Sequence, residues 1–225
     1  MDVIVPARND DATVAQVVAA IPPRLVRTVV VVDRGSTDAT ARVAEDAGAV
    51  VLREPRPGYG AACLRGVAHL TTLPRPPAAV VFLAGDGSDD PADLPALLHP
   101  LRDNLFDLVI GSRVLGHTEL SPGQRAGNLV AVSLIRAVYN HRYTDLGPFR
   151  ALSYPALIAL GMRDAGQGWD VELQVRAVKV GLHIAEVPVT GRRRAQRQTL
   201  PAALRGAAGT AAKVLFQIFR HSTAR

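Results

Sequence analysis

Residues 28–52 read TVVVVDRGSTDATARVAEDAGAVVL, and this stretch decides the fold. The β-branched run Thr28–Val32 predicts a buried strand, and Ser36 is a good N-cap for a helix that ends at Gly48. A second apolar run, Ala49–Leu52, follows the helix at once. A strand, a helix and a strand in this order predict two parallel strands joined by a crossover helix.

The same alternation extends on both sides of this stretch. Further strands are expected at Val3–Val5, Ala79–Leu83 and Leu108–Gly111, with helices of period 3.6 between the strands. No internal repeat or low-complexity linker divides the chain, so we predict one α/β domain. In the less regular second half the pattern predicts a helix over 123–140, a strand or turn over 147–152, helices over 155–161 and 169–180, a strand over 183–187 and a last helix over 201–220.

The composition fits a globular protein of 225 residues. Apolar residues make up 48% and charged residues 20%, and the mean hydropathy is +0.14, which excludes a disordered or collagen-like chain. No apolar run approaches the roughly 20 residues that cross a bilayer, and no signal peptide is expected at the start. The single Cys63 excludes an intrachain disulfide and a cysteine-based zinc site. We therefore expect a reducing, cytoplasmic setting.

The chain is basic, with a net charge of +6 and an isoelectric point near 10.2. This charge favours anionic partners, which include nucleotide phosphates, lipid headgroups and nucleic acid. Aromatic residues total only 4% and are not interleaved with the arginines, so nucleic acid is the least favoured partner and none is expected. The basic residues gather at the C-terminal end, as Arg192, Arg193, Arg194, Arg197, Arg205, Lys213, Arg220 and Arg225.

Polar residues follow three of the predicted strands, at 6–10, 33–38 and 85–91. Because ligands bind beyond the carboxyl ends of an open parallel sheet, we expect these segments to meet at one cleft. Asp33 can accept a hydrogen bond from a ribose hydroxyl or a base N–H. The same residues also fit an ordinary turn that leads into a helix.

Two further segments near this cleft have more than one interpretation. Gly58-Tyr-Gly-Ala-Ala opens a helix that runs to about Leu70, and its small residues either expose N–H groups to a phosphate or sugar or simply start the helix. Asp86, Asp89 and Asp90 lie close together after a hydrophobic strand, as the oxygen ligands of a divalent cation such as Mg²⁺ or Mn²⁺ do. Asp89 and Asp90 with Pro91 could instead begin the next helix, and the cation is favoured for Asp86. Asp90 and Asp93 are assigned to cap the next helix.

Several motifs occur in a characteristic order. The first half contains Val3-Ile-Val-Pro-Ala-Arg-Asn-Asp, Val32-Asp-Arg-Gly-Ser-Thr-Asp, Gly58-Tyr-Gly-Ala-Ala and Phe82-Leu-Ala-Gly-Asp-Gly-Ser-Asp-Asp-Pro. The second half contains Asp107-Leu-Val-Ile-Gly-Ser-Arg, Thr144-Asp-Leu-Gly-Pro-Phe-Arg-Ala, Gly168-Trp-Asp-Val-Glu-Leu-Gln and Glu186-Val-Pro-Val. Together they resemble the inverting family 2 glycosyltransferases, in the branch of dolichyl- and polyprenyl-phosphate sugar synthases. The resemblance implies the Rossmann-like GT-A fold, a three-layer sandwich around a mainly parallel sheet.

The resemblance also implies a UDP- or GDP-sugar donor and a divalent cofactor, Mg²⁺ or Mn²⁺. The ion would help to neutralise the departing nucleoside diphosphate, and Asp86 and Ser88 are its implied ligands. Arg113 and Arg125 are implied phosphate contacts, with a solvated surface arginine as the alternative for each. The residues implied to bind the nucleotide sugar are Pro6, Ala7, Arg8, Asn9, Asp10, Asp33, Gly58, Gly60, Ala61, Gly85, Asp86, Arg113 and Arg125.

Four carboxylates are implied as catalytic residues: Asp86, Asp145, Asp170 and Glu172. A hydroxyl acceptor needs a carboxylate to take its proton, and Glu172 or Asp170 would serve. A lipid phosphate such as a polyprenyl phosphate is already anionic and needs no strong base. Trp169 either stacks on a sugar or packs in the core.

The chain departs from the family pattern at two positions. The family's metal motif is usually Asp-x-Asp, whereas here it is Ala84-Gly85-Asp86. Because Mg²⁺ takes few protein carboxylates, Asp86, the diphosphate and water could still hold it. The alternative is a catalytically silent nucleotide-sugar-binding protein. Arg34 stands where the family often has a second acidic or a neutral residue, which bears on nucleotide choice.

The domain is expected to span residues 1–195, with a nucleotide half over 1–115 and an acceptor half over 116–195. Residues 196–225 combine arginines with apolar residues, as an interfacial helix does. We expect this helix to attach the protein peripherally to the cytoplasmic face of an anionic membrane. The alternative is that its apolar side packs on the domain or on a second subunit, as in a homodimer.

Overall fold

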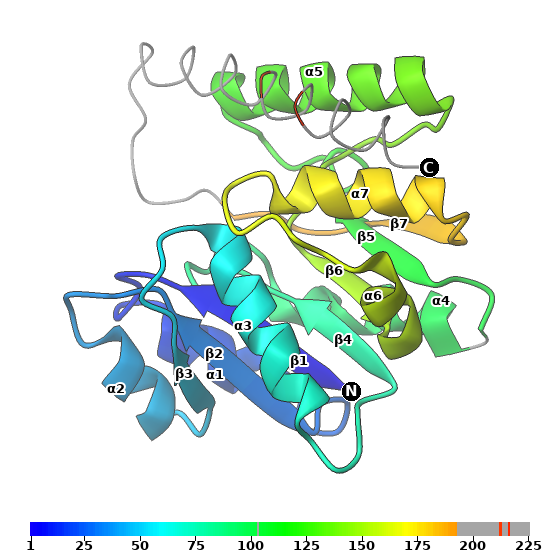
Figure 1. Cartoon of the computed structure of the whole chain (residues 1–225). Coiled ribbons are helices and arrows are strands. Elements are labelled where there is room, and N and C mark those ends of the chain that lie inside the picture. Colours follow the sequence, from blue (N-terminus) through cyan, green and yellow to red (C-terminus); the bar gives the residue numbers. More distant parts are fainter. Residues whose placement is uncertain (103, 193–211, 213–215, 217–225) are drawn as a thin grey trace.

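Short apolar runs of the chain form one central sheet in the computed structural model, which describes residues 1–102, 104–192, 212 and 216 (Figure 1). Over these residues the sheet has seven strands in the order β3-β2-β1-β4-β6-β5-β7. All neighbouring pairs are parallel except those of β6, which runs antiparallel to β4 and to β5. The strands are β1 (Asp2–Ala7), β2 (Thr28–Asp33), β3 (Val50–Arg53), β4 (Ala79–Phe82), β5 (Leu108–Ser112), β6 (Arg150–Ser153) and β7 (Ile184–Pro188).

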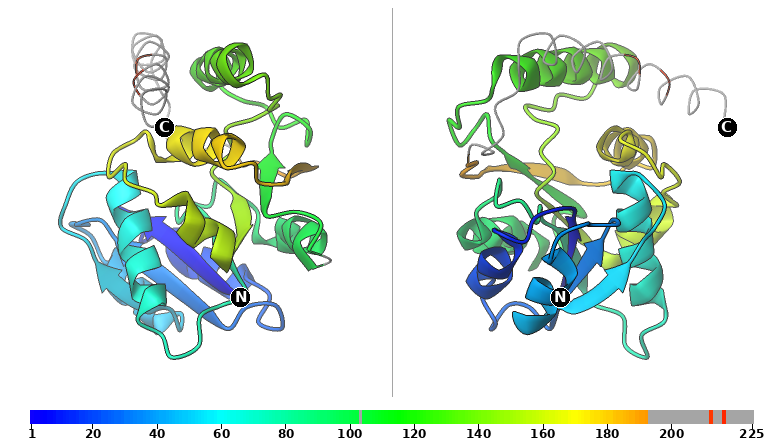
Figure 2. Two further views of the ribbon diagram at one scale, coloured as in Figure 1. Left: turned by 45° about the vertical axis from the view of Figure 1, so that its right-hand side comes forward. Right: turned by 90° about the vertical axis from the view of Figure 1, so that its left-hand side faces the viewer.

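Helices cover both faces of this sheet, which gives three layers (Figures 1 and 2). The helices are α1 (Val14–Ala20), α2 (Thr40–Asp46), α3 (Tyr59–Thr71), α4 (Leu94–Arg102), α5 (Pro122–Tyr139), α6 (Tyr154–Leu160) and α7 (Trp169–Lys179). One core lies between the sheet and α3, α5, α6 and α7, and the other between the sheet and α1, α2 and α4. Because β1 is buried on both faces, its sequence reads as an apolar run. The predicted α/β class and the mainly parallel sheet are confirmed.

One expectation about local structure needs correction, and another is confirmed with an added detail. Ser36 does not cap α2, which begins four residues later, at Thr40; its hydroxyl accepts the backbone N–H of Asn9 instead, at 3.0 Å. The strand or turn expected over 147–152 is the strand β6, and its antiparallel direction was not predicted. That direction places Arg150 beside Phe82 and Ile110, at the carboxyl ends of β4 and β5.

The last helix expected, over 201–220, lies outside the described residues except for Ala212 and Phe216, so the structure does not test it. In the part of the chain that the structure describes, no helix is both long and apolar enough to cross a membrane.

Candidate functional site

The carboxyl ends of β1, β2 and β4 meet at one edge of the sheet, and the loops that leave them are bonded to one another. Thr37 N–H donates to Asn9 Oδ1 at 2.9 Å, and Asp10 N–H donates to Thr40 Oγ1 at 2.8 Å. Thr13 Oγ1 donates to Gly85 O at 2.9 Å, which joins the β1 loop to the β4 loop. The predicted residues of these three loops therefore share one edge, as the parallel arrangement requires.

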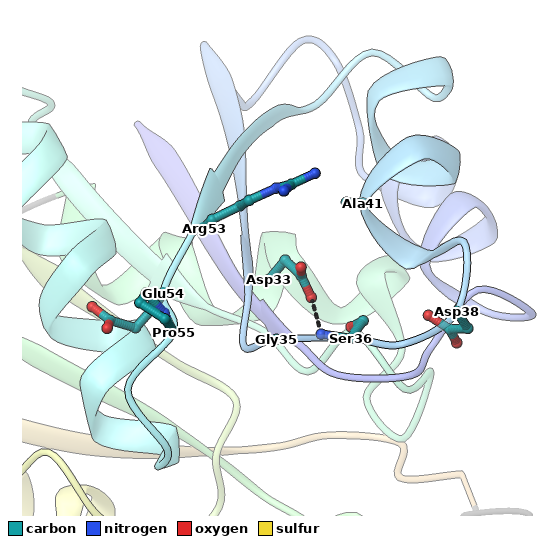
Figure 3. A pocket seen from close by; sticks show the side chains of 8 residues that line it. All are labelled: Asp33, Gly35, Ser36, Asp38, Ala41, Arg53, Glu54 and Pro55. Carbon is teal, nitrogen blue, oxygen red and sulfur yellow. Dashed lines mark hydrogen bonds between the residues drawn. The ribbon is translucent and has the colours of Figure 1, made fainter.

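A pocket of about 360 Å³ opens beside the ends of β2 and β3 (Figure 3). Asp33 lines it and is only 6% exposed; its Oδ1 accepts the N–H of Ser36 at 3.0 Å. No other described residue bonds to its second oxygen, so that oxygen is available to a ligand donor. The lining residues are Asp33, Gly35, Ser36, Asp38, Ala41, Arg53, Glu54 and Pro55.

Arg53, Glu54 and Pro55 were not among the predicted site residues. The signal for them was their place at the carboxyl end of β3: Arg53 ends this strand beside Asp33, and Glu54 and Pro55 follow it. Both oxygens of Glu54 are held by Arg56, at 2.8 and 2.7 Å, and these bonds lower the pKa of Glu54 to about 2. The Glu54 carboxylate therefore bonds within the protein rather than offering a free acceptor to a ligand.

The loop after β4 carries the predicted metal ligands. Asp86 Oδ1 accepts the N–H of Ser88 at 3.0 Å, across a turn in which Gly87 has φ +72°. Asp89 is 2% exposed, and its Oδ2 accepts the N–H of Ala84 at 3.1 Å. Burial raises the pKa of Asp89 to about 6, against the lowering effect of that hydrogen bond.

A divalent ion that keeps several waters fits this loop better than one that needs a full protein cage. Within the described residues, no group of three or more His, Cys, Asp and Glu side chains could hold a metal ion. The loop instead offers carboxylate and hydroxyl oxygens, the donors that Mg²⁺ and Mn²⁺ prefer. Asp86 and Ser88 remain the proposed ligands.

The same loop is braced by the chain that follows β7. Arg192 N–H donates to Ser88 O at 2.8 Å, and the Arg192 guanidinium pairs with Asp90 at 2.7 Å. Thr190 N–H donates to Asp93 Oδ2 at 2.6 Å. Asp90 also caps the short 3₁₀ turn 91–93 by accepting the N–H of Ala92, as expected, whereas the Asp93 carboxylate bonds to Thr190 rather than capping.

On the side where the acceptor is expected, Arg113 and Asp145 form a buried pair. Asp145 is fully buried, and its carboxylate accepts from the side chain and the backbone N–H of Arg113. Glu186 holds the neighbouring loop by accepting the N–H groups of Thr144 and Asp145, at 2.9 and 3.2 Å. Burial raises the pKa of Glu186. Asp145 therefore orients Arg113, and Glu186, which was not predicted as a site residue, orients Asp145.

Asp170 and Glu172, the two expected proton acceptors, differ sharply in their surroundings. Asp170 has a side chain that is 28% exposed and that accepts from the fully buried Arg150 at 2.8 Å. Burial raises the pKa of Asp170, although Arg150 opposes the shift. Glu172 is fully buried and accepts from the N–H groups of Arg163 and Asp164 and from Arg176. Of the two, only Asp170 is placed to meet a substrate.

The start of α3 does not present the free N–H groups that the sequence suggested. Gly60 N–H donates to Gly166 O, and Ala61 N–H donates to Ala165 O, both at 2.8 Å. A Cβ atom at Gly58 or Gly60 would fall on a carbonyl oxygen of the loop at 164–165. These small residues therefore let the loop before α7 dock on α3. The N–H groups of Gly60 and Ala61 are thus not free for the expected phosphate contacts, whereas the expected contact at Gly58 stays a prediction.

Three other candidates are placed as follows. Trp169 is fully buried and packs edge-on against Phe82, with 5.8 Å between the ring centroids, so it belongs to the core. Arg125 is exposed on the first turns of α5. Arg34 lies with its guanidinium carbon 6.0 Å from the centre of the Tyr59 ring.

The loop of the predicted metal ligands and the expected acceptor side affect each other electrostatically. Beside the effect of burial, the charges of Arg113 and Arg150 lower the pKa of Asp89, and the charge of Asp86 raises it. Against the effect of burial, the charge of Asp170 helps to raise the pKa of Arg113. The arrangement places an acidic loop next to two held arginines and a partly exposed carboxylate. Such a site can bind a diphosphate through a cation and place an acceptor beside it.

Comparisons with known proteins agree with this arrangement. The family model described as Glycosyl transferase family 2 matches residues 2–165. An uncharacterized glycosyltransferase of Mycobacterium tuberculosis is 37% identical over 206 residues, which cover 91% of each chain. The undecaprenyl-phosphate mannosyltransferase of Micrococcus luteus is 34% identical over 175 residues, which cover 72% of this chain and 70% of that protein.

Solved structures show the same fold. Glucosyl-3-phosphoglycerate synthase from Mycobacterium tuberculosis, in complex with Mn²⁺, UDP and glucosyl-3-phosphoglycerate, matches with a TM-score of 0.76 and 27% identity. The match covers 96% of this chain and 78% of that chain. The same synthase in complex with Mg²⁺ and UDP matches with a TM-score of 0.75 and 26% identity, over 96% of this chain and 78% of that chain.

Proposed function

The chain belongs to glycosyl transferase family 2, and from this premise we propose that it moves a sugar from a UDP- or GDP-sugar to an acceptor, with inversion and with help from a divalent ion. It has the GT-A fold and is a glycosyltransferase. The observation that carries the proposal is the single edge that holds the Asp33 pocket, the Asp86 loop and the Arg113 and Asp170 pairs. A catalytically silent binder is not favoured.

The donor is proposed to lie along the ends of β1, β2 and β4. Asp33 would accept a hydrogen bond from the base or the ribose through its free oxygen. Residues 6–10 would border the nucleoside. Gly85 lets the β4 loop lie against β1, because a Cβ atom there would crowd Ala7 and Val5. Asp86 and Ser88 would hold Mg²⁺ or Mn²⁺, which would neutralise charge on the leaving diphosphate.

The acceptor oxygen attacks the anomeric carbon from the side opposite the diphosphate. The new C–O bond forms as the bond to the diphosphate breaks, and the nucleoside diphosphate leaves. Arg113, held by Asp145, would bind an acceptor or donor phosphate through its remaining N–H groups, and Arg125 would add charge at the rim. Asp170 would take the proton of a hydroxyl acceptor.

We favour a polyprenyl phosphate as the acceptor. One relative is an undecaprenyl-phosphate mannosyltransferase, and an anionic acceptor suits a site beside Arg113, whose guanidinium is held by Asp145. With such an acceptor no proton needs removal, and Asp170 would position Arg150 instead. Three further proposals stand beside this one. Residues 196–225 would attach the protein peripherally to a membrane, residues 1–115 and 116–195 would form the nucleotide and acceptor halves of the domain, and the protein would form a homodimer.

The test begins with donor binding. Thermal unfolding is measured with UDP and with GDP, each with and without Mn²⁺; stabilisation that needs the ion supports the proposal. The protein is then incubated with UDP- and GDP-sugars and polyprenyl phosphate, and the products are identified by mass spectrometry. Stabilisation by no nucleotide, or stabilisation that is indifferent to the ion, would contradict the proposed metal-assisted transfer.

A further inference from the structure

Position 84 lacks the acidic side chain that the Asp-x-Asp motif would supply to the proposed ion. With Ala84 in the motif, Asp86 is the single carboxylate of the Asp-x-Asp pattern. Asp86 and Ser88 alone give the ion one carboxylate and one hydroxyl. A second anionic oxygen would have to come from outside the motif.

The carboxylate of Asp89 is bonded to the backbone at position 84. The left-handed turn at Gly87 folds the loop back, and Asp89 Oδ2 accepts the N–H of Ala84 at 3.1 Å. The carboxylate of Asp89 therefore sits against the backbone of the very residue that lacks its acid. Asp86 is close enough to repel it.

The surroundings of Asp89 do not balance its charge. The residue is 2% exposed, and among the described residues its carboxylate accepts only the one hydrogen bond from Ala84 and forms no salt bridge. The two cations nearby are committed elsewhere, since Arg113 pairs with Asp145 and Arg150 with Asp170. A buried carboxylate with one hydrogen bond and a like charge beside it is costly unless a cation joins it.

We propose that Asp89 is a ligand of the divalent ion, so that Asp86 and Asp89 together replace the Asp-x-Asp pair. The inference rests on the proposed function, because it concerns the ion that this function requires. Two carboxylates are a typical protein share for Mg²⁺, which would take its other ligands from phosphates and water.

A purely structural role for Asp89, bracing the loop through Ala84, makes a different prediction. Asn has the same shape as Asp and keeps an acceptor oxygen for the Ala84 N–H, but it has no charge to offer a cation. Asp89→Asn therefore removes the proposed metal ligand while it leaves the brace in place. Asp90→Asn is the matched control, because it removes the neighbouring charge at a carboxylate that pairs with Arg192.

The experiment measures Mn²⁺ affinity by electron paramagnetic resonance, with UDP or GDP present, for the full chain and its variants. We expect Asp89→Asn to weaken Mn²⁺ binding by at least about tenfold without lowering the melting temperature. Asp90→Asn should bind Mn²⁺ like the unmodified chain. Adding Ala84→Asp to the Asp89→Asn variant should restore affinity, since it returns a carboxylate to the motif, and a structural brace would not be rescued in this way.

Unchanged Mn²⁺ affinity in Asp89→Asn would overturn this inference while ion-dependent nucleotide binding still supported the proposed function. No Mn²⁺ binding by the unmodified chain would overturn both. A crystal structure of the unmodified chain with Mn²⁺ and UDP tests the inference without any variant. An Asp89 oxygen at about 2.1 Å from the ion is expected, and an Asp89 carboxylate outside its coordination shell would refute the assignment.

Discussion

Arg113 and Asp145 are joined at two points inside the protein. Arg113 Nε–H donates to Asp145 Oδ2 at 2.8 Å, and its NH2 group donates to Oδ1 at 2.9 Å. The pair connects the end of β5 to the loop before β6, two segments 32 residues apart. It fixes the guanidinium at the edge where we propose that a phosphate binds.

Asp145→Asn should destabilise the fold strongly, because it leaves the largely buried Arg113 without a counter-charge. Removing one partner of a buried pair costs about 3–5 kcal/mol in the free energy of unfolding. Urea unfolding followed by circular dichroism measures this loss. Asp46→Asn is the control: it breaks the exposed pair with Arg42, which is worth about 0.3–0.5 kcal/mol. Equal losses in the two variants would show that Asp145 does not hold Arg113 as described.

Asp33→Asn should weaken donor binding and leave the fold intact. Asp33 offers a carboxylate oxygen to the pocket, and a hydrogen bond to a charged group contributes about 1.5–3 kcal/mol, or roughly tenfold to a hundredfold in affinity. Isothermal titration calorimetry with UDP and with GDP measures the change. Asp38→Asn, at the exposed rim of the same pocket, should change affinity much less. A larger loss of affinity in Asp38→Asn than in Asp33→Asn would show that the nucleoside does not bind at Asp33.

Asp170→Asn separates the two acceptor classes. If the acceptor is a hydroxyl, loss of the proton acceptor should lower kcat by about a hundredfold or more. If it is a polyprenyl phosphate, kcat should fall far less, since no proton is transferred. Steady-state rates with both kinds of acceptor decide between them, with thermal unfolding as the check on the fold.

The pH profile gives a second measure of Asp170. Its pKa is raised, and only the ionised form accepts a proton, so the rate with a hydroxyl acceptor should rise with pH through a pKa above the ordinary value of 3.8. This acid limb should disappear in Asp170→Asn. If the rate of Asp170→Asn still rises with pH in the same range, the titrating group is a residue other than Asp170.

Gly60→Ala should destabilise the protein although it introduces a better helix former. An alanine Cβ at Gly60 would fall on the carbonyl oxygen of Asp164, and such overpacking costs about 1–3 kcal/mol. Thermal unfolding measures the loss. Ala68→Gly, at an exposed position of the same helix, reports the helix propensity alone and should cost about 1 kcal/mol. A stabilised Gly60→Ala protein would mean that the loop yields easily.

Most of the sheet could be predicted because buried parallel strands have continuous apolar runs in their sequence. Thr28–Val32 and Leu108–Gly111, for example, each fall within one residue of the observed strand. The direction of β6 could not be predicted, since a short apolar run looks the same whichever way its strand lies in the sheet. Ser36 misled the helix boundary because its partner, Asn9, comes from a loop 27 residues away.

The same limit applies to the site. Ligands bind beyond the carboxyl ends of parallel strands, and this rule pointed to Asp33 and Asp86 because it depends only on where the strands end. It could not reveal that the N–H groups at 163–164 bond to Glu172, or that Gly58 and Gly60 make room for the loop at 164–165. Those roles depend on contacts between segments distant in sequence, and a single sequence does not display them.

Thr190 and Arg192 hold the loop after β4 through hydrogen bonds, so the choice of C-terminal boundary in a shortened protein affects that loop. A chain cut after Arg192 would discard the basic end yet keep the backbone bonds to Ser88 and Asp93. A chain cut after Pro188 would lose them, and any fall in ion affinity would then be mistaken for a requirement for the tail. Membrane-binding comparisons should therefore be made with the boundary beyond residue 192.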